Sequence, residues 1–177
     1  MDIILKRSIE WLDRLIAFDT TSRLSNLDLI SDIEKYMKEL GVPTRLTHDK
    51  DKTKANLWCT IGPQDIGGVV LSGHTDVVPI DGQEWTKTPF KMSEESGKLF
   101  GRGTSDMKGF CAIALAMAPE MKSRDLKVPI HFAFSFDEEV GCVGVRHLIK
   151  DVVDNLPLPR AVIVGEPTSM KIVGGNK

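Results

Sequence analysis

Acidic side chains and one histidine follow the apolar segments of this sequence. His74 and Asp76 come after VVLSG, three acids come after HFAFSF, Glu166 comes after AVIVG, and Asp106 precedes an Ala-rich segment. If the apolar segments are strands of one parallel sheet, their carboxyl ends lie at the same edge, where open α/β sheets bind ligands. The sequence therefore predicts a cluster at this edge, composed of His74, Asp76, Asp106, Asp137, Glu138, Glu139 and Glu166.

Each of these residues, taken alone, has an ordinary structural explanation. Three consecutive acids usually form a solvated surface or a helix start, and an Asp before a helix usually caps it. Together they are harder to explain, because unit charges about 5 Å apart repel by about 3 kcal/mol per pair at an effective dielectric near 20. The sequence places no Lys or Arg directly beside each acid. We therefore expect a divalent metal ion, or a pair of them, at this edge.

The local spacings suit such a site. Residues i and i+2 of an extended segment point the same way, so Asp76 can accept the second ring N–H of His74 and fix its tautomer. Neighbouring residues point in opposite directions, so Glu138 and Glu139 can divide the work between binding metal and activating water. One His with several carboxylates favours zinc, cobalt or manganese.

The elements that must position these residues follow from the apolar periodicity. Amphipathic helices are predicted near residues 5–16 and 27–40. A long loop rich in Pro, Gly and Asp, near residues 79–103, is expected to build part of a site. Apolar strands that alternate with helices predict an α/β fold, with a mostly parallel central sheet flanked by helices on both faces. The remaining predicted elements are helices at 107–121 and 143–153, strand-like segments at 44–47 and 56–61, and buried strands at 69–71, 128–136 and 161–164.

Composition narrows the classes of partner and compartment. The chain has 177 residues, about one domain, and its 23 basic and 25 acidic residues give a net charge of −2, which argues against nucleic acid. The longest charge-free apolar stretch, Gly109 to Pro119, is too short for a membrane span, so a cytoplasmic protein is expected. Three widely spaced cysteines favour free thiols over a disulfide framework or a thiolate zinc site.

Four motifs stand in order along the chain: SGHTDVVP, LFGRGTSDMKG, DEEVGC and GEPT. In order and spacing they resemble the co-catalytic zinc metallopeptidase family, which contains acetylornithine deacetylases, succinyl-diaminopimelate desuccinylases, aminoacylases and glutamate carboxypeptidases. The resemblance covers essentially the whole chain and is nearest to the deacetylase branch, with the desuccinylases next. It implies a zinc-exopeptidase-like catalytic domain that holds two divalent metal ions, zinc first, with cobalt or manganese as alternatives.

The resemblance also implies a role for each candidate residue. Glu138 is the general base, and Asp76 orients His74. The peptide bond that follows the bridging ligand, Asp106, is cis. The implied metal ligands are His74 and Glu166 for one ion, Glu139 for the other, and Asp106 for both.

The implied reaction is hydrolysis of a small N-acyl amino acid, first N-acetylornithine in arginine biosynthesis. The alternatives are N-succinyl-diaminopimelate or the substrate of another deacylase or carboxypeptidase of the same family. Family members continue into a lid or dimerisation domain, so the resemblance implies that residues 1–177 are the N-terminal part of the catalytic domain of a homodimer. Residues 170–177 are expected to form the strand that leads into that domain, and Asn176 stands where relatives often carry His. A further His ligand then lies outside this chain, and we expect the chain alone to be nearly inactive.

One other function, metal binding without catalysis, remains open, and another, nucleotide binding, is disfavoured. A metal-binding module without catalysis would keep the ligands, although it has no need of the base Glu138. Nucleotide binding is disfavoured because Asp106 replaces the third glycine of a GxGxxG turn. His131 and His147 lie outside the motifs and are expected to be structural.

Overall fold

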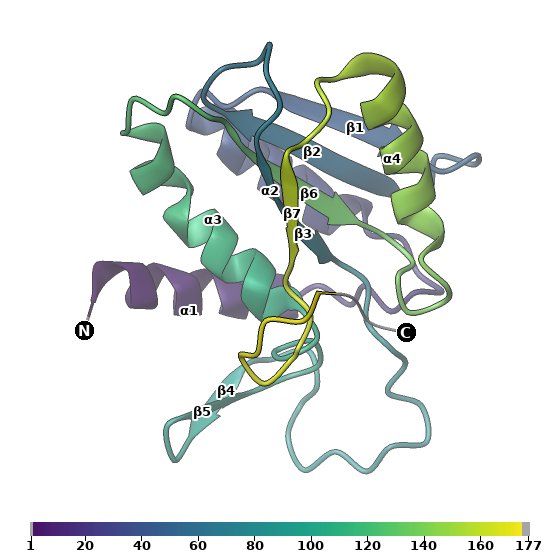
Figure 1. Cartoon of the computed structure of the whole chain (residues 1–177). Coiled ribbons are helices and arrows are strands. Elements are labelled where there is room, and N and C mark those ends of the chain that lie inside the picture. Colours follow the sequence, from purple (N-terminus) through teal and green to yellow (C-terminus); the bar gives the residue numbers. More distant parts are fainter. Residues whose placement is uncertain (1, 175–177) are drawn as a thin grey trace.

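A five-stranded sheet forms the centre of the molecule (Figure 1). The computed structural model describes residues 2–174. Four of the five strands run in the same direction, and only β2 is antiparallel to its two neighbours. The predicted α/β fold with a mostly parallel sheet is therefore confirmed. In spatial order the strands are β1 (Thr44–His48), β2 (Ala55–Ile61), β6 (Ile130–Ser135), β3 (Val69–His74) and β7 (Ala161–Val164).

Helices cover the two faces of the sheet unequally. The first face carries α1 (Ile3–Ile16), α2 (Leu27–Glu39) and α3 (Lys108–Lys122), and α1 packs along α3. The opposite face carries α4 (Val143–Asn155). Within residues 2–174, no helix combines the length and the apolar character that a membrane span requires.

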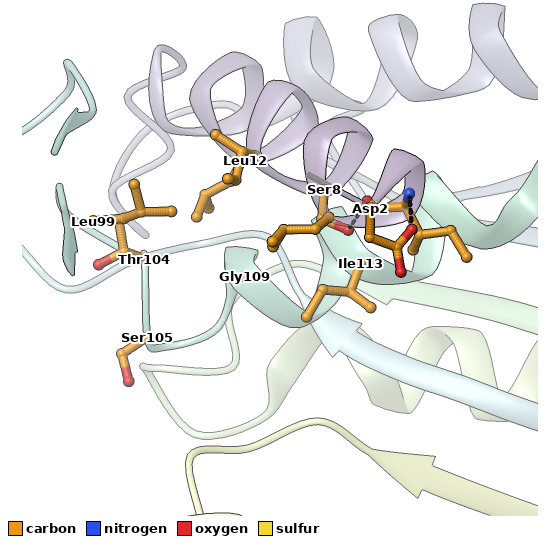
Figure 2. A pocket seen from close by; sticks show the side chains of 11 residues that line it. Asp2, Ser8, Leu12, Leu99, Thr104, Ser105, Gly109 and Ile113 are labelled. Atoms are coloured by element: carbon orange, nitrogen blue, oxygen red, sulfur yellow. Dashed lines mark hydrogen bonds between the residues drawn. The ribbon is translucent and has the colours of Figure 1, made fainter. Parts of the chain in front are cut away.

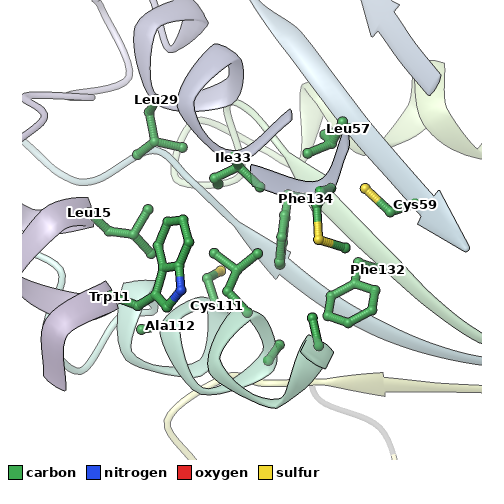
Figure 3. Close-up of a cluster of buried hydrophobic side chains, with 14 of the residues drawn as sticks. Trp11, Leu15, Leu29, Ile33, Leu57, Cys59, Cys111, Ala112, Phe132 and Phe134 are labelled. Carbon is green, nitrogen blue, oxygen red and sulfur yellow. The ribbon is translucent and has the colours of Figure 1, made fainter. Parts of the chain in front are cut away.

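Strand β2 shows how the alternation of side chains divides the core. Leu57 and Cys59 point toward the three-helix face, where Phe132 and Phe134 of β6 lie between the sheet and the helices (Figure 3). Trp58, between them, points to the other face and packs with α4. All seven residues of β2 are buried, and its sequence, ANLWCTI, is mostly apolar, with Asn56 and Thr60 as buried polar residues. The thiols of Cys59 and Cys111 are free and buried, and Cys142 is free and exposed, which confirms the expectation for the cysteines.

The long loop predicted near residues 79–103 contains a small hairpin instead of irregular chain alone. Strands β4 (Ser93–Glu95) and β5 (Lys98–Phe100) form a separate two-stranded sheet. Ser96 and Gly97 join them with φ of 52° and 72°, the geometry of a two-residue hairpin turn. The prediction missed this hairpin because three-residue strands are too short to show an alternating pattern.

The prediction for β7 was wrong in one respect. It was expected to be buried, but it is an exposed edge strand, with Val162, Ile163 and Val164 each more than half exposed. Residues 170–174 were expected to continue as a strand, yet they form a turn and irregular chain, because no described strand pairs with them. The expectation for Asn176 falls outside the described residues.

Candidate metal centre

The candidate site is organised around His74, the last residue of β3, whose side chain is 1% exposed. Its Nδ1 lies 2.9 Å from the backbone carbonyl oxygen of Asp76 and 3.5 Å from Oδ1 of the same residue. Since a carbonyl oxygen can only accept, Nδ1 carries the hydrogen, and Nε2 is left as the atom that can bind a metal. Asp76 therefore orients the ring. Its backbone carbonyl group makes the shorter contact, whereas the sequence predicted that its carboxylate would do so.

Three carboxylates from three other elements surround Nε2 of His74. Asp106 Oδ1 lies at 3.1 Å, Glu138 Oε2 at 3.8 Å and Glu166 Oε1 at 3.8 Å. Asp106 precedes α3, Glu138 follows β6, and Glu166 follows β7. The edge at which the parallel strands end thus collects these side chains, as the order of motifs predicted.

The candidate ligand atoms fall into two groups that share His74. In each group the atoms lie within 4.8 Å of one another. One group contains Asp106 and Glu139, and the other contains Glu138 and Glu166. The two adjacent glutamates thus belong to different groups, whereas the resemblance placed Asp106 with Glu166 and made Glu138 a base. The ligand assignment itself stays a prediction.

Asp76 holds the chain that carries these two glutamates. Its Oδ1 accepts the backbone N–H of Glu138 at 3.0 Å, and its Oδ2 accepts that of Glu139 at 3.2 Å. The hydroxyl of Ser22 donates to Oδ2 at 2.7 Å. Burial alone would raise the pKa of Asp76, but its hydrogen bonds, chiefly those from His74 and Ser22, lower it. The carboxylate is therefore a fixed, ionised anchor, which sequence reasoning did not foresee.

The other acidic side chains of the site, Glu139 and Glu166, lie close to further negative charges. Burial raises the pKa of Glu139, and the charge of Asp106 raises it further. Burial likewise raises the pKa of Glu166, and the charges of Asp106 and Glu138 add to the effect. A divalent cation would relieve this repulsion, and one imidazole nitrogen with several carboxylate oxygens is a donor set that zinc, cobalt or manganese accepts. The residues present therefore fit the predicted metal ions.

The histidine responds to the same surroundings in the opposite sense. Burial lowers the pKa of His74, but the hydrogen bond and charge of Asp76 and the charge of Glu166 outweigh burial and raise the pKa to about 9. A cation at Nε2 would take the place of the proton that these acids favour.

The segment that carries Asp106 is anchored by a buried lysine. The peptide bond between Asp106 and Met107 is cis, as the resemblance implied. Asp106 does not cap α3, because Met107 occupies the N-cap position and makes no side-chain cap bond. The next residue, Lys108, is buried and donates from Nζ to the carbonyl oxygens of Leu15 at 3.0 Å and Phe18 at 2.8 Å. Lys108 thus ties the start of α3 to the end of α1 beside the site.

Asp137, for which the sequence suggested no role, forms an ion pair. Its Oδ1 lies 2.5 Å from Nζ of Lys54, and both side chains are largely buried. Lys54, like Ser22, lies outside the four motifs and was missed. Only the register of β2 against β6 could have pointed to Lys54, and that register is not visible in the sequence.

Two cavities lie near the segment 101–106. A cavity of about 200 Å³ is lined by Arg102, Asp106 and Glu139, and so opens onto the candidate ligands. A larger cavity of about 670 Å³ lies between α1 and α3, where Leu12, Leu99 and Ile113 line it (Figure 2). None of the candidate ligands lines the larger cavity, so size does not identify the site.

The two other histidines considered in the sequence belong to neither group of candidate ligands. His131 is buried in β6, where Nδ1 lies 2.9 Å from the hydroxyl oxygen of Thr60. His147, on α4, stacks on Phe136 with ring centroids 6.3 Å apart. Both positions agree with the structural roles expected for them.

Comparison with known proteins gives matching results. Residues 70–174 match the model of the family described as peptidase family M20/M25/M40. An acetylornithine deacetylase from Shigella sonnei is 38% identical over 154 residues, which are 86% of this chain and 39% of that protein. The chain thus spans about two fifths of the length of this curated relative.

Solved structures share the fold. A metallo-carboxypeptidase of the M20 family, Sso-CP2 from Sulfolobus solfataricus, is 25% identical, with a TM-score of 0.70 over 93% of this chain and 37% of its own. The YXEP protein of Bacillus subtilis, described as a dinuclear metal-binding peptidase, is 22% identical, with a TM-score of 0.61 over 91% of this chain and 42% of its own.

Proposed function

Because the chain belongs to peptidase family M20/M25/M40, we propose that it carries the metal centre of a hydrolase that cleaves the amide bond of small N-acyl amino acids. One observation supports this proposal above the others: Nε2 of His74 has three carboxylates within 3.8 Å, each from a different element. The first substrate to consider is N-acetylornithine, since the curated relative is an acetylornithine deacetylase. The reaction would then belong to arginine biosynthesis in the cytoplasm.

We propose that two divalent ions, zinc first, occupy the site. His74, Asp106, Glu139 and Glu166, all of which belong to the groups of candidate ligand atoms, would hold them. The sharing of Asp106 between the two ions is what the family resemblance implies. When bound, the ions would supply Lewis acidity, which lowers the pKa of water and stabilises negative charge on the amide oxygen. The YXEP protein, with the same fold, is described as binding two metals.

Glu138 is the proposed general base. Its side chain is 34% exposed, and Oε2 lies beside Nε2 of His74, so it borders the site and still reaches solvent. Such a carboxylate can accept the proton of the attacking water and then deliver it to the amine that leaves. Asp76 supports this role, because its carboxylate fixes the backbone N–H of Glu138.

The organisation of the protein is part of the proposal. Strand β7 offers an apolar edge that pairs with no other strand among residues 2–174, with Val162 and Val164 more than half exposed. We propose that further strands of the catalytic domain cover this edge, that a lid domain joins two such proteins into a homodimer, and that the second ion gains another ligand there. Asp106 and Glu139 alone would hold that ion weakly.

The test is a pair of measurements on the same preparations. Calorimetric titration with Zn²⁺ and Co²⁺ measures binding to residues 1–177, and we expect one ion to bind much more tightly than the other. Release of ornithine from N-acetylornithine, and of diaminopimelate from its N-succinyl derivative, is then followed with and without a C-terminal extension that supplies the lid. Full activity of the 177-residue chain with excess metal would contradict the proposed organisation, and activity of the extended form on neither substrate would contradict the proposed function.

A metal-binding module without catalysis is the second candidate. It is favoured by the position of Glu138, whose Oε2 belongs to a group of candidate ligand atoms with His74 and Glu166. In such a module Glu138→Gln would weaken metal binding, whereas in a hydrolase it would mainly abolish turnover.

A further inference from the structure

The carboxylate of Asp137 is held by a lysine at the end of the connection between β1 and β2. Lys54 Nζ lies 2.5 Å from Asp137 Oδ1, and the two side chains are 14% and 16% exposed. Nζ also donates to the backbone carbonyl of Ser22. Most other ion pairs of the described residues are far more exposed, including the Lys150–Asp154 pair on α4 at 78% and 50%. Solvent therefore screens this pair less than it screens the exposed pairs.

The register of the sheet brings the two residues opposite each other. In the antiparallel pairing of β2 with β6, Leu57 faces Phe134. Counting three residues back along β2 and three forward along β6 leads to Lys54 and Asp137. The ion pair thus continues the pairing of the two strands beyond the last hydrogen-bonded positions, at the point where the chain turns toward His74.

Asp137 has an unusual backbone conformation at this point. Its φ is 52°, the left-handed region, which Asp and Asn tolerate better than most residues. The residue ends the extended run of β6 and redirects the chain. Glu138 and Glu139 follow immediately, and their N–H groups bind the carboxylate of Asp76.

Ser22 connects Lys54 and Asp76, the two residues that anchor this turn. Its carbonyl oxygen accepts from Nζ of Lys54, and its hydroxyl donates to Oδ2 of Asp76 at 2.7 Å. Lys54 therefore holds the side chain at the start of the turn, and Asp76 holds the two N–H groups that follow. Lys54 is itself fixed, because its backbone N–H donates to Oδ1 of Asp49 at 2.9 Å within the β1–β2 connection.

We propose that Lys54 is a positioning residue of the metal centre, which holds Asp137 in the left-handed turn that presents Glu138 and Glu139 to His74. The inference rests on the proposed function for the roles of the two glutamates. Lys54 contacts none of the candidate ligands, so it acts through the backbone of the turn. Side chains that orient metal ligands typically contribute about 10- to 100-fold to metal affinity.

Metal affinity and stability, measured on the same variants, test the proposal. Zn²⁺ affinity is obtained by competition with a chromogenic chelator, and stability by urea unfolding without metal. Lys54→Met should weaken Zn²⁺ binding about tenfold or more. Lys54→Arg should retain the affinity, since the guanidinium can still pair with Asp137. Lys150→Met, which removes an exposed pair with the same 2.5 Å distance, is the matched control and should bind Zn²⁺ as the unchanged protein does.

The double variant separates positioning from the cost of an unpaired buried charge. Lys54→Met leaves Asp137 without its partner, and Asp137→Asn leaves Lys54 without its own, so each single change destabilises the fold. Combining them removes both charges and should return much of the stability, while Asn still accepts the left-handed conformation. If Lys54 positions the turn, Zn²⁺ affinity stays about tenfold low in the double variant.

Two outcomes would overturn the inference. One is unchanged Zn²⁺ affinity in folded Lys54→Met or, should that variant not fold, in Asp137→Asn. The other is a double variant that recovers affinity together with stability. A protein that binds Zn²⁺ and shows the expected losses, yet hydrolyses no N-acyl amino acid when extended by its lid, would remove the proposed function and leave the role of Lys54 standing.

Discussion

Nε2 of His74 lies 3.1 Å from Oδ1 of Asp106, although 32 residues separate them in the chain. The first residue ends a buried strand, and the second precedes a helix on the face of the same sheet. Only the tertiary fold brings these two atoms together. Around this contact the structure gathers Glu138, Glu139 and Glu166, and each of the predictions below tests a consequence of that gathering or of the core that supports it.

The adjacent glutamates should respond differently to the same substitution. Glu138→Gln in the protein extended by its lid should keep both metals and lose about 100- to 10,000-fold in turnover, because the amide cannot accept the proton of water. Glu139→Gln should instead weaken the binding of one metal. Metal content by elemental analysis, beside the rate of ornithine release, distinguishes the two. Loss of metal from Glu138→Gln would show that this residue is a ligand.

Asp76→Asn tests the anchor beneath the site. An amide offers only one acceptor oxygen to the two N–H groups of Glu138 and Glu139, so one buried donor is left unpaired. We expect the free energy of unfolding to fall by about 1–3 kcal/mol and Zn²⁺ affinity to fall about tenfold or more. Asp65→Asn, at an exposed position, is the control. Equal urea midpoints for the two variants would contradict the anchor.

His131 should make stability depend on pH. Burial lowers its pKa, and Nε2 has no hydrogen-bond partner among the described residues. As the pH falls, the unfolded chain therefore takes up a proton at His131 before the folded protein does, so stability is present above a pH of about 6.5 and is lost below it.

Urea unfolding at pH 7 and pH 5 measures the effect. Replacing His131 with Gln should reduce the difference in free energy between these pH values, because Gln does not titrate. His48→Gln, at an exposed position of β1, serves as control and should leave the difference unchanged. A difference that is the same in all three proteins would rule out His131 as its source.

The three cysteines should react in two steps. Cys142 is exposed, whereas Cys59 and Cys111 are buried, and burial raises the pKa of Cys111 to about 12. A chromogenic disulfide reagent should therefore modify one thiol per folded chain and the other two only after denaturation. Cys142→Ser should abolish the first step. Rapid reaction of a second thiol in the native protein would show that the core opens more readily than this structure implies.

The sequence by itself determined the elements and the edge at which they deliver their polar residues. Helices and strands leave local periodicities of 3.6 and 2 residues, and these located α1 to α4 and the five strands of the central sheet. The motifs then placed His74, Asp106 and Glu166 after or before those elements, which is enough to predict a shared edge.

Tertiary structure alone decided how the residues at that edge divide their contacts. Whether Asp76 meets the ring of His74 through its carbonyl or its carboxylate depends on the turn after β3, which no spacing specifies. The partner of Asp137 depends on the register of β2 against β6, since a shift of one residue would move Lys54 to the other face. Exposure of β7 depends on which neighbour lies beside it. Register, turn geometry and strand neighbours arise from contacts between segments far apart in the chain, and local patterns carry no record of them.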